Sequence, residues 1–113
     1  MGVEEVLQEA KARLENMLAP IGGVGVGDDP STDELFDTIK AEIDKQNAID
    51  AAKTDWSVVV ASAEELLNDK AKDFRVALYW AAGSVILRGM PGLVDGLVLL
   101  HELSDAYWDT MHP

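Results

Sequence analysis

The chain has 113 residues and a mass of 12.2 kDa, a length that suits one domain with a single hydrophobic core. It has no cysteine, which excludes disulfide bonds and thiolate metal sites. Its net charge of −12 opposes binding to nucleic acids and anionic membranes, and no apolar run reaches the ~18 residues of a membrane span. Because the first residues also lack a signal-peptide pattern, we expect a cytoplasmic protein without membrane insertion.

The first predicted element is an amphipathic helix over residues 3–18. Its apolar residues recur at intervals of three and four, and Leu7 and Leu14 lie on this stripe. Pro20 ends the helix, because the residue before a proline is disfavoured in helical geometry. Residues 19–30 then form a Gly-rich linker, which should leave the helix free to pack on its own domain or on a neighbouring molecule.

Two further helices are predicted between residues 31 and 69. Ser31 and Glu34 have the spacing of a capping box, which places the start of one helix there and its end between residues 47 and 53. The next helix is capped by Thr54 or Asp55, has an inward apolar stripe and ends near Asp69.

The C-terminal part of the chain is strongly apolar and predicts two adjoining helices. Residues 74–87 are apolar nearly all round, which is typical of a helix enclosed by others. After a break at residues 88–92, the last helix should bury a stripe made of Leu93, Leu97, Leu100, Tyr107, Trp108 and Met111. The predicted fold class is all-α, a compact bundle of four to five helices built from antiparallel helical hairpins, with residues 31–113 as the main domain.

No residue pattern predicts a catalytic centre, a metal site or a cofactor. The Gly-rich stretch lacks the spacing of a phosphate loop, because Asp28 stands where a lysine or a glycine would be needed. His101 and Asp105 lie one helical turn apart, but the second histidine of the zinc-protease motif is absent. The favoured interpretation is a protein-interaction domain that is not an enzyme, and a small metal-dependent enzyme using His101 and Asp105 is an alternative.

Three residues are predicted to lie at interfaces. Trp80 follows Tyr79 on the helix, and because neighbouring side chains cannot face the same way, Trp80 is expected to face a partner. Leu7 and Leu14 belong to the first helix, which we expect to mediate self-association or to lie in a partner's groove, unless it folds back on its own bundle. The acidic middle of the chain supports a second hypothesis, an acidic helical inhibitor or mimic that binds a basic protein surface.

Six short segments carry a resemblance to a known family. They are residues 18–21 (LAPI), 27–30 (GDDP), 55–56 (DW), 72–77 (KDFRVA), 92–97 (GLVDGL) and 107–113 (YWDTMHP). In this order they resemble the ImpA-related N-terminal domain of TssA proteins from bacterial type VI secretion systems, over residues 18–113.

The resemblance implies a non-enzymatic assembly factor that joins the baseplate and the tail sheath and tube in the bacterial cytoplasm. Its partners would be proteins of the baseplate, the sheath or the membrane complex, and no cofactor is implied. Lys72 and Asp73 would open the central helix, and Tyr107 and Trp108 would close the core. The other motif residues that it singles out are Asp55, Trp56, Arg75, Asp109, His112 and Pro113.

Overall fold

The computed structural model describes residues 2–22, 25–47 and 53–113. Its helices are α1 (Val3–Arg13), α2 (Glu15–Leu18), α3 (Glu34–Asp44), α4 (Trp56–Asp69), α5 (Phe74–Arg88) and α6 (Met90–Tyr107), with 3₁₀ turns at Pro30–Thr32 and Lys45–Asn47. Isolated β-bridges occur in these ranges, but no strand does. The all-α prediction is confirmed.

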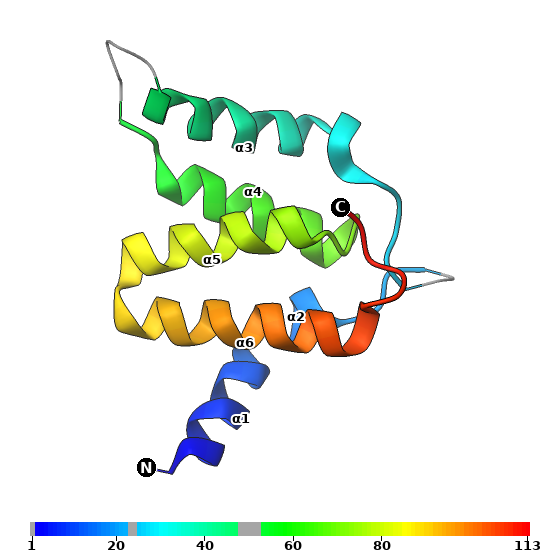
Figure 1. Cartoon of the computed structure of the whole chain (residues 1–113), viewed down its shortest axis with the longest axis vertical. Helices are drawn as coiled ribbons and strands as arrows, with labels where there is room; N and C mark the ends of the chain where they lie inside the picture. Colours follow the sequence, from blue (N-terminus) through cyan, green and yellow to red (C-terminus); the bar gives the residue numbers. More distant parts are fainter. Residues whose placement is uncertain (1, 23–24, 48–52) are drawn as a thin grey trace.

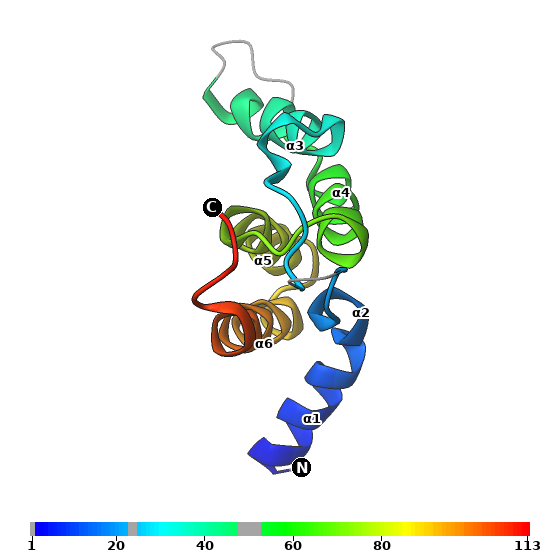
Figure 2. The same cartoon turned by 90° about the vertical axis from the view of Figure 1, so that its right-hand side faces the viewer.

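Helices α3 to α6 run alternately in opposite directions, each packed on the next (Figure 1). The connection between α5 and α6 is the single residue Gly89, whose φ of 67° is a conformation that glycine adopts without steric cost. Seen from the side, α4 and α2 lie on one side of the α5–α6 pair, and α1 extends away below them (Figure 2). The molecule is therefore thin, with principal extents of 44 × 37 × 18 Å.

The hydrophobic core lies between these helices. Its buried residues are Ala10, Leu14, Met17, Phe36, Ile39, Val59, Ala63, Leu66, Leu67, Val76, Ala77, Trp80, Val98, Leu99 and Leu103. Two glycines of α6 bring it very close to α5: a Cβ atom on Gly92 would lie 1.9 Å from the carbonyl oxygen of Ser84, and one on Gly96 would lie 2.8 Å from Cβ of Ala81. Side chains larger than glycine at these positions would force the α5–α6 hairpin apart.

The predicted helix over residues 3–18 is divided in two. Leu14 has φ −94° and ψ 1°, which separates α1 from α2. Ala10, Leu14 and Met17 are all buried, so this segment folds back on its own bundle. The prediction of Leu14 as an interface residue is therefore wrong, because its side chain is only 1% exposed within the domain's own core.

The described part of the predicted linker, residues 19–22 and 25–30, is packed rather than free. Val26 is buried, and its carbonyl oxygen accepts a hydrogen bond from the backbone N–H of Lys72 at 2.7 Å. The N–H of Ile21 donates to the carbonyl oxygen of Gly25, and Pro30 is buried. Residues 23 and 24 of this segment lie outside the described residues. The contacts of the remainder tie the N-terminal helices to the start of α5.

The predicted capping box at Ser31 and Glu34 is not the one that forms. Ser31 lies inside a 3₁₀ turn that begins at Pro30, and its N–H donates to the carboxylate of Asp29. The N-cap of α3 is instead Asp33, whose carboxylate accepts a hydrogen bond from the N–H of Leu35 at 2.8 Å. Because the turn uses residues 30–32, the helix starts two residues later than the sequence pattern indicates.

Candidate functional site

Lys72 lies at the centre of a cluster of motif residues. Its side chain is fully buried, and its Nζ atom donates hydrogen bonds to the carbonyl oxygens of Met17, at 2.7 Å, and of Leu67. These carbonyls belong to the last turns of α2 and α4, where backbone acceptors lack helical partners and the helix dipole favours a cation. Burial lowers the pKa of Lys72 to about 8, against the opposing effect of Asp69. The lysine thus joins the ends of two helices.

Asp73 and Arg75 organise the start of α5. Asp73 is buried and caps the helix by accepting from the N–H of Val76 at 3.1 Å, as predicted. Arg75 donates to both carboxylate oxygens of Asp73, at 3.2 and 2.7 Å, and to Asp29 at 3.2 Å. Its guanidinium also lies 5.0 Å from the centre of the Phe36 ring. These contacts connect α5 with the segment before α3 and with α3 itself.

The C-terminal motif segment closes this cluster from the other side. The hydroxyl of Tyr107 donates to the carbonyl oxygen of Leu18 at 2.8 Å. His112 pairs through its backbone with Lys72 and Phe74, at 3.0 and 2.8 Å, and its Nε2 atom lies 3.0 Å from the carbonyl oxygen of Gly27. The segment therefore connects the end of α6 with the end of α2, with Gly27 and with the start of α5.

Trp108, Asp109 and Pro113 differ from the other motif residues because they are exposed. Trp108 is 73% exposed, so the prediction that it closes the core is wrong. It follows Tyr107, and the half-buried Tyr107 takes the inward position at the end of α6. Two consecutive helical residues point in directions about 100° apart, so only one of this pair can face the core.

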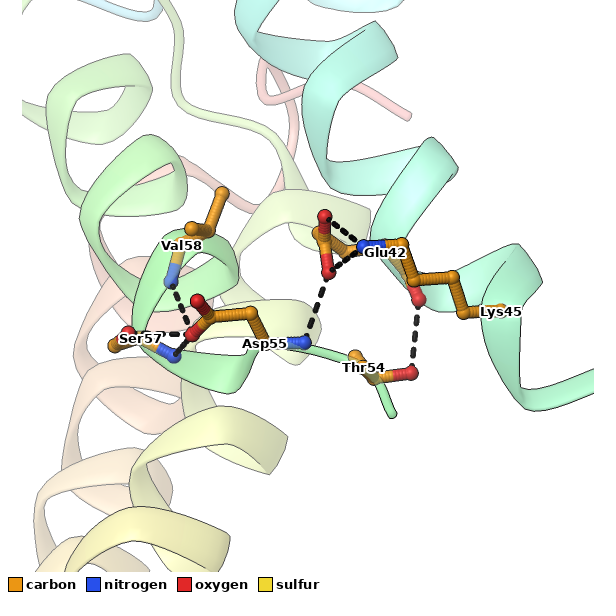
Figure 3. A network of polar contacts seen from close by, with 6 residues as sticks. All are labelled: Glu42, Lys45, Thr54, Asp55, Ser57 and Val58. Atoms are coloured by element: carbon orange, nitrogen blue, oxygen red, sulfur yellow. Dashed lines mark hydrogen bonds and ion pairs between the residues drawn. The ribbon is translucent and has the colours of Figure 1, made fainter. Parts of the chain in front are cut away.

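Asp55 belongs to a second network, which joins α3 to the start of α4 (Figure 3). Its carboxylate caps α4 by accepting from the N–H groups of Ser57 and Val58, so Asp55 rather than Thr54 is the cap of the predicted pair. Hydrogen bonding to Ser57 lowers the pKa of Asp55. The carboxylate of Glu42 accepts from the N–H of Asp55 at 2.8 Å and from Lys45. The hydroxyl of Thr54 donates to the carbonyl oxygen of Glu42 at 2.8 Å. The neighbouring motif residue Trp56 is half-buried against the core.

A large apolar surface lies on the outer side of α5 and α6. Six side chains form it, each between 36% and 73% exposed, and we call them the α5–α6 face: Leu78, Val85, Ile86, Met90, Leu97 and Trp108. Leu78 and Val85 are seven residues apart on α5, and Met90, Leu97 and Trp108 follow at seven and eleven residues along α6 and its C-cap. These spacings are close to whole numbers of turns, whereas Ile86 points about 80° away from Leu78 around α5. In Figure 2, α2 and α4 lie on one side of the α5–α6 pair, and the six side chains are exposed rather than covered by these helices.

The comparisons with known proteins agree with the motif cluster. The family described as "ImpA, N-terminal, type VI secretion system" matches residues 18–113. The chain belongs to this family. It is 43% identical over 63 residues to the type VI secretion system component TssA1 of Pseudomonas aeruginosa, a match that covers 56% of the chain and 18% of TssA1.

A solved structure is also similar to this ImpA N-terminal domain. It is the N-terminal domain, including the conserved ImpA_N region, of the TssA component of the type VI secretion system from Burkholderia cenocepacia. The TM-score is 0.77 at 36% identity, over 88% of this chain and 39% of that one. The chain thus spans less than half the length of either relative, and it shares its fold with the Burkholderia cenocepacia domain.

Trp80 does not face outward in this ImpA N-terminal domain. It is 5% exposed and lines a pocket of about 220 Å³ with Leu14, Arg88 and Asp95, so the prediction that it contacts a partner is wrong. The outward direction on α5 is taken by Leu78, Val85 and Ile86 instead. The sequence could not show this, because a helix that is apolar all round gives no indication of which face its neighbours cover.

Sequence reasoning also missed an ion-pair cluster around Asp95. This carboxylate is 2% exposed and accepts hydrogen bonds from Arg13, at 2.6 and 3.3 Å, and from Arg88 at 2.8 Å. Burial alone would raise the pKa of Asp95, but the two arginines outweigh it and hold the pKa below its usual value. The cluster anchors α1 to the α5–α6 hairpin. The sequence feature that could have indicated this cluster is Asp95 itself, a carboxylate in an otherwise apolar helical segment.

His101 and Asp105 are both exposed on α6. Among the described residues, no three histidine, aspartate or glutamate side chains are grouped as a metal site would require. No described helix is long and apolar enough to cross a membrane.

Proposed function

We propose that the chain is a scaffold module of a type VI secretion assembly protein in the bacterial cytoplasm. In this proposal it binds proteins of the baseplate, the tail sheath or the membrane complex and catalyses no reaction. The motif residues support a structural role, because Lys72, Asp73, Arg75 and Tyr107 make contacts within the domain. Family membership supports the secretion context.

The α5–α6 face is the observation that carries the proposal. Exposed apolar patches of this kind mark protein contact sites, since leaving them in water is unfavourable. The last two helices and the tail carry six charged residues, and the six exposed side chains of the face are all apolar. An enzyme would need polar groups that converge in a cleft, whereas a binding module needs an accessible apolar surface.

A pull-down against each purified baseplate, sheath and membrane-complex protein tests this function. Wild-type chain should retain at least one component, and an Ile86→Glu, Leu97→Glu double variant should lose it, because the new carboxylates would be buried unpaired. The matched control is Ala41→Glu with Ala61→Glu, which adds the same two charges at exposed positions of α3 and α4. Failure of the wild-type chain to retain any component would contradict the proposal.

Self-association through the first helix stays a proposal. The exposed apolar surface of this helix is smaller than the sequence pattern indicates. Val3 and Leu7 are 77% and 39% exposed on the part of α1 that projects from the bundle (Figure 1), whereas the later residues of its stripe are buried. Sedimentation of wild-type chain and of Leu7→Glu would measure it.

An acidic hollow favours the second candidate, an acidic mimic that binds a basic protein surface. The hollow has a volume of about 710 Å³, and Asp28, Asp29, Asp33 and Asp69 are among its lining residues. Two of these carboxylates pair with Lys70 and Arg75 inside the domain, which reduces the local negative charge. If this candidate is right, Asp28→Asn with Asp69→Asn should abolish retention of a partner, and Ile86→Glu with Leu97→Glu should not.

A further inference from the structure

The α5–α6 face has the length of an ordinary helix. From Met90 to Trp108 the α6 residues of the face extend over about 27 Å, at 1.5 Å per residue, with the exposed His101 on the same side between Leu97 and Trp108. The α5 residues, on the neighbouring helix, extend over about 12 Å from Leu78 to Ile86. A helix of a partner protein that lies along this face would pack on α5 and α6 at once. It would cover apolar side chains of both helices that are exposed in the isolated chain. An isolated loop would cover only part of the face.

The two ends of the face differ in charge. Near Trp108, Asp105 and Asp109 are both exposed, and the C-terminal carbonyls of α6 add partial negative charge. Near Met90 the nearest charged residue in the sequence is Arg88, whose guanidinium is paired with the buried Asp95. The α5–α6 face is therefore bordered by negative charge at its Trp108 end and not at its Met90 end. The net charge of the whole chain is −12.

We propose that the α5–α6 face binds an amphipathic helix of a partner protein, apolar along one side and basic at the end that lies over Trp108. This inference rests on the proposed scaffold function and specifies the chemistry of the partner. The apolar side of the helix covers Leu78, Ile86 and Leu97, and its lysines or arginines meet Asp105 and Asp109.

A second copy of the chain fits this face less well. Each copy would bring a net charge of −12, and neither supplies an exposed basic group among the residues of the face. A basic helix is attracted by the same field that opposes self-association. The net charge of the chain therefore favours a basic helix over a second copy of the chain.

A designed peptide tests the proposed chemistry directly. The probe is a fluorescein-labelled peptide of about 18 residues, the length of α6, with leucines at positions i, i+3, i+4 and i+7 and lysines confined to one end. A scrambled peptide of the same composition, whose leucines share no helix face, is its control. Fluorescence anisotropy with the 113-residue chain at about 0.15 M salt measures both affinities. The amphipathic peptide should bind at least about ten-fold more tightly.

The double variant Ile86→Glu, Leu97→Glu separates docking from simple charge attraction. It makes the chain more acidic, so attraction alone predicts equal or tighter binding of the lysine-containing peptide. Docking on the face predicts binding weaker by at least about ten-fold, because two carboxylates would be buried against leucines. Circular dichroism checks that the variant keeps its helices, and Ala41→Glu with Ala61→Glu should bind as wild type does.

A second pair of substitutions tests the orientation. Asp105→Asn with Asp109→Asn should weaken binding of the amphipathic peptide by roughly two- to five-fold and flatten its salt dependence. Unchanged salt dependence would overturn the assignment of the basic end to Trp108.

Two results would overturn the inference as a whole. One is equal binding of the amphipathic and scrambled peptides. The other is a wild-type dimer in sedimentation that Ile86→Glu with Leu97→Glu dissociates, since a second copy would then occupy the face. If either occurs while the pull-down still retains a secretion component, the scaffold function stands and only the chemistry of the partner is wrong.

Discussion

The buried amine of Lys72 makes the stability of the domain depend on pH in the alkaline range. Burial lowers its pKa to about 8 in the folded chain, from an ordinary value of 10.5. The unfolded chain therefore binds the proton more tightly, and the free energy of unfolding should rise as the pH increases from about 8 to about 10.5. A neutral amine keeps N–H donors for the carbonyls of Met17 and Leu67, so its contacts survive deprotonation.

The size of the effect follows from these two pKa values. A group that titrates at about 8 when folded and at 10.5 when unfolded contributes about 2–3 kcal/mol more stability at pH 10 than at pH 7. Lys72→Met removes this contribution. The variant also leaves the carbonyl oxygens of Met17 and Leu67 without a donor, at a cost of about 1–3 kcal/mol each at any pH.

Urea unfolding followed by circular dichroism, from about pH 7 to about pH 10, measures the effect as a difference between two proteins. The stability gap between wild type and Lys72→Met should widen by about 2–3 kcal/mol over this range. Other groups that titrate in the alkaline range are common to both proteins and cancel. Lys40→Met, at an exposed lysine of α3, is the matched control and should show no widening. A gap for Lys72→Met that stays constant or narrows would refute the reasoning.

Three further substitutions test the packing. Trp108→Ala should change the free energy of unfolding by less than about 1 kcal/mol in urea titration, because the ring is 73% exposed; a loss of about 3 kcal/mol or more would place it in the core. Leu14→Glu should collapse the melting temperature while Leu7→Glu leaves it nearly unchanged, and equal effects in calorimetry would contradict the packing of α1 and α2. Gly92→Ala should destabilise by more than about 2 kcal/mol, because its Cβ would meet the carbonyl of Ser84, and a neutral outcome in thermal unfolding would show that α5 and α6 are further apart.

The elements predicted best are those whose signals are local. Asp55 and Asp73 lie directly before apolar segments, and a carboxylate at that position satisfies free N–H groups of the first turn whatever the rest of the chain does. Helical periodicity likewise follows from burial of one side of each segment. The order of antiparallel helices then follows from the short connections between them.

The errors concern which side of a helix its neighbours cover. Trp80 and Trp108 both lie in apolar segments, and nothing in the local pattern shows that α2 and α4 pack on one side only. The α5–α6 face was not predicted for the same reason. The sequence pattern places Leu97 and Ile86 in the core, because it does not show which side of each helix is covered. Lys72 was assigned to the start of a helix, but its role depends on the ends of α2 and α4, which are 55 and 5 residues away in the sequence.

Photo-crosslinking in living bacteria tests most directly whether the α5–α6 face is where a secretion component binds. Benzoylphenylalanine would replace Leu97, which is 58% exposed on the face, in the natural full-length protein of cells with an active type VI secretion system. The control position is Ala61, exposed on α4. We expect Leu97 to yield a crosslink to a baseplate, sheath or membrane-complex protein and Ala61 to yield none. Crosslinks from Ala61 alone, or none from Leu97 while secretion continues, would contradict this account.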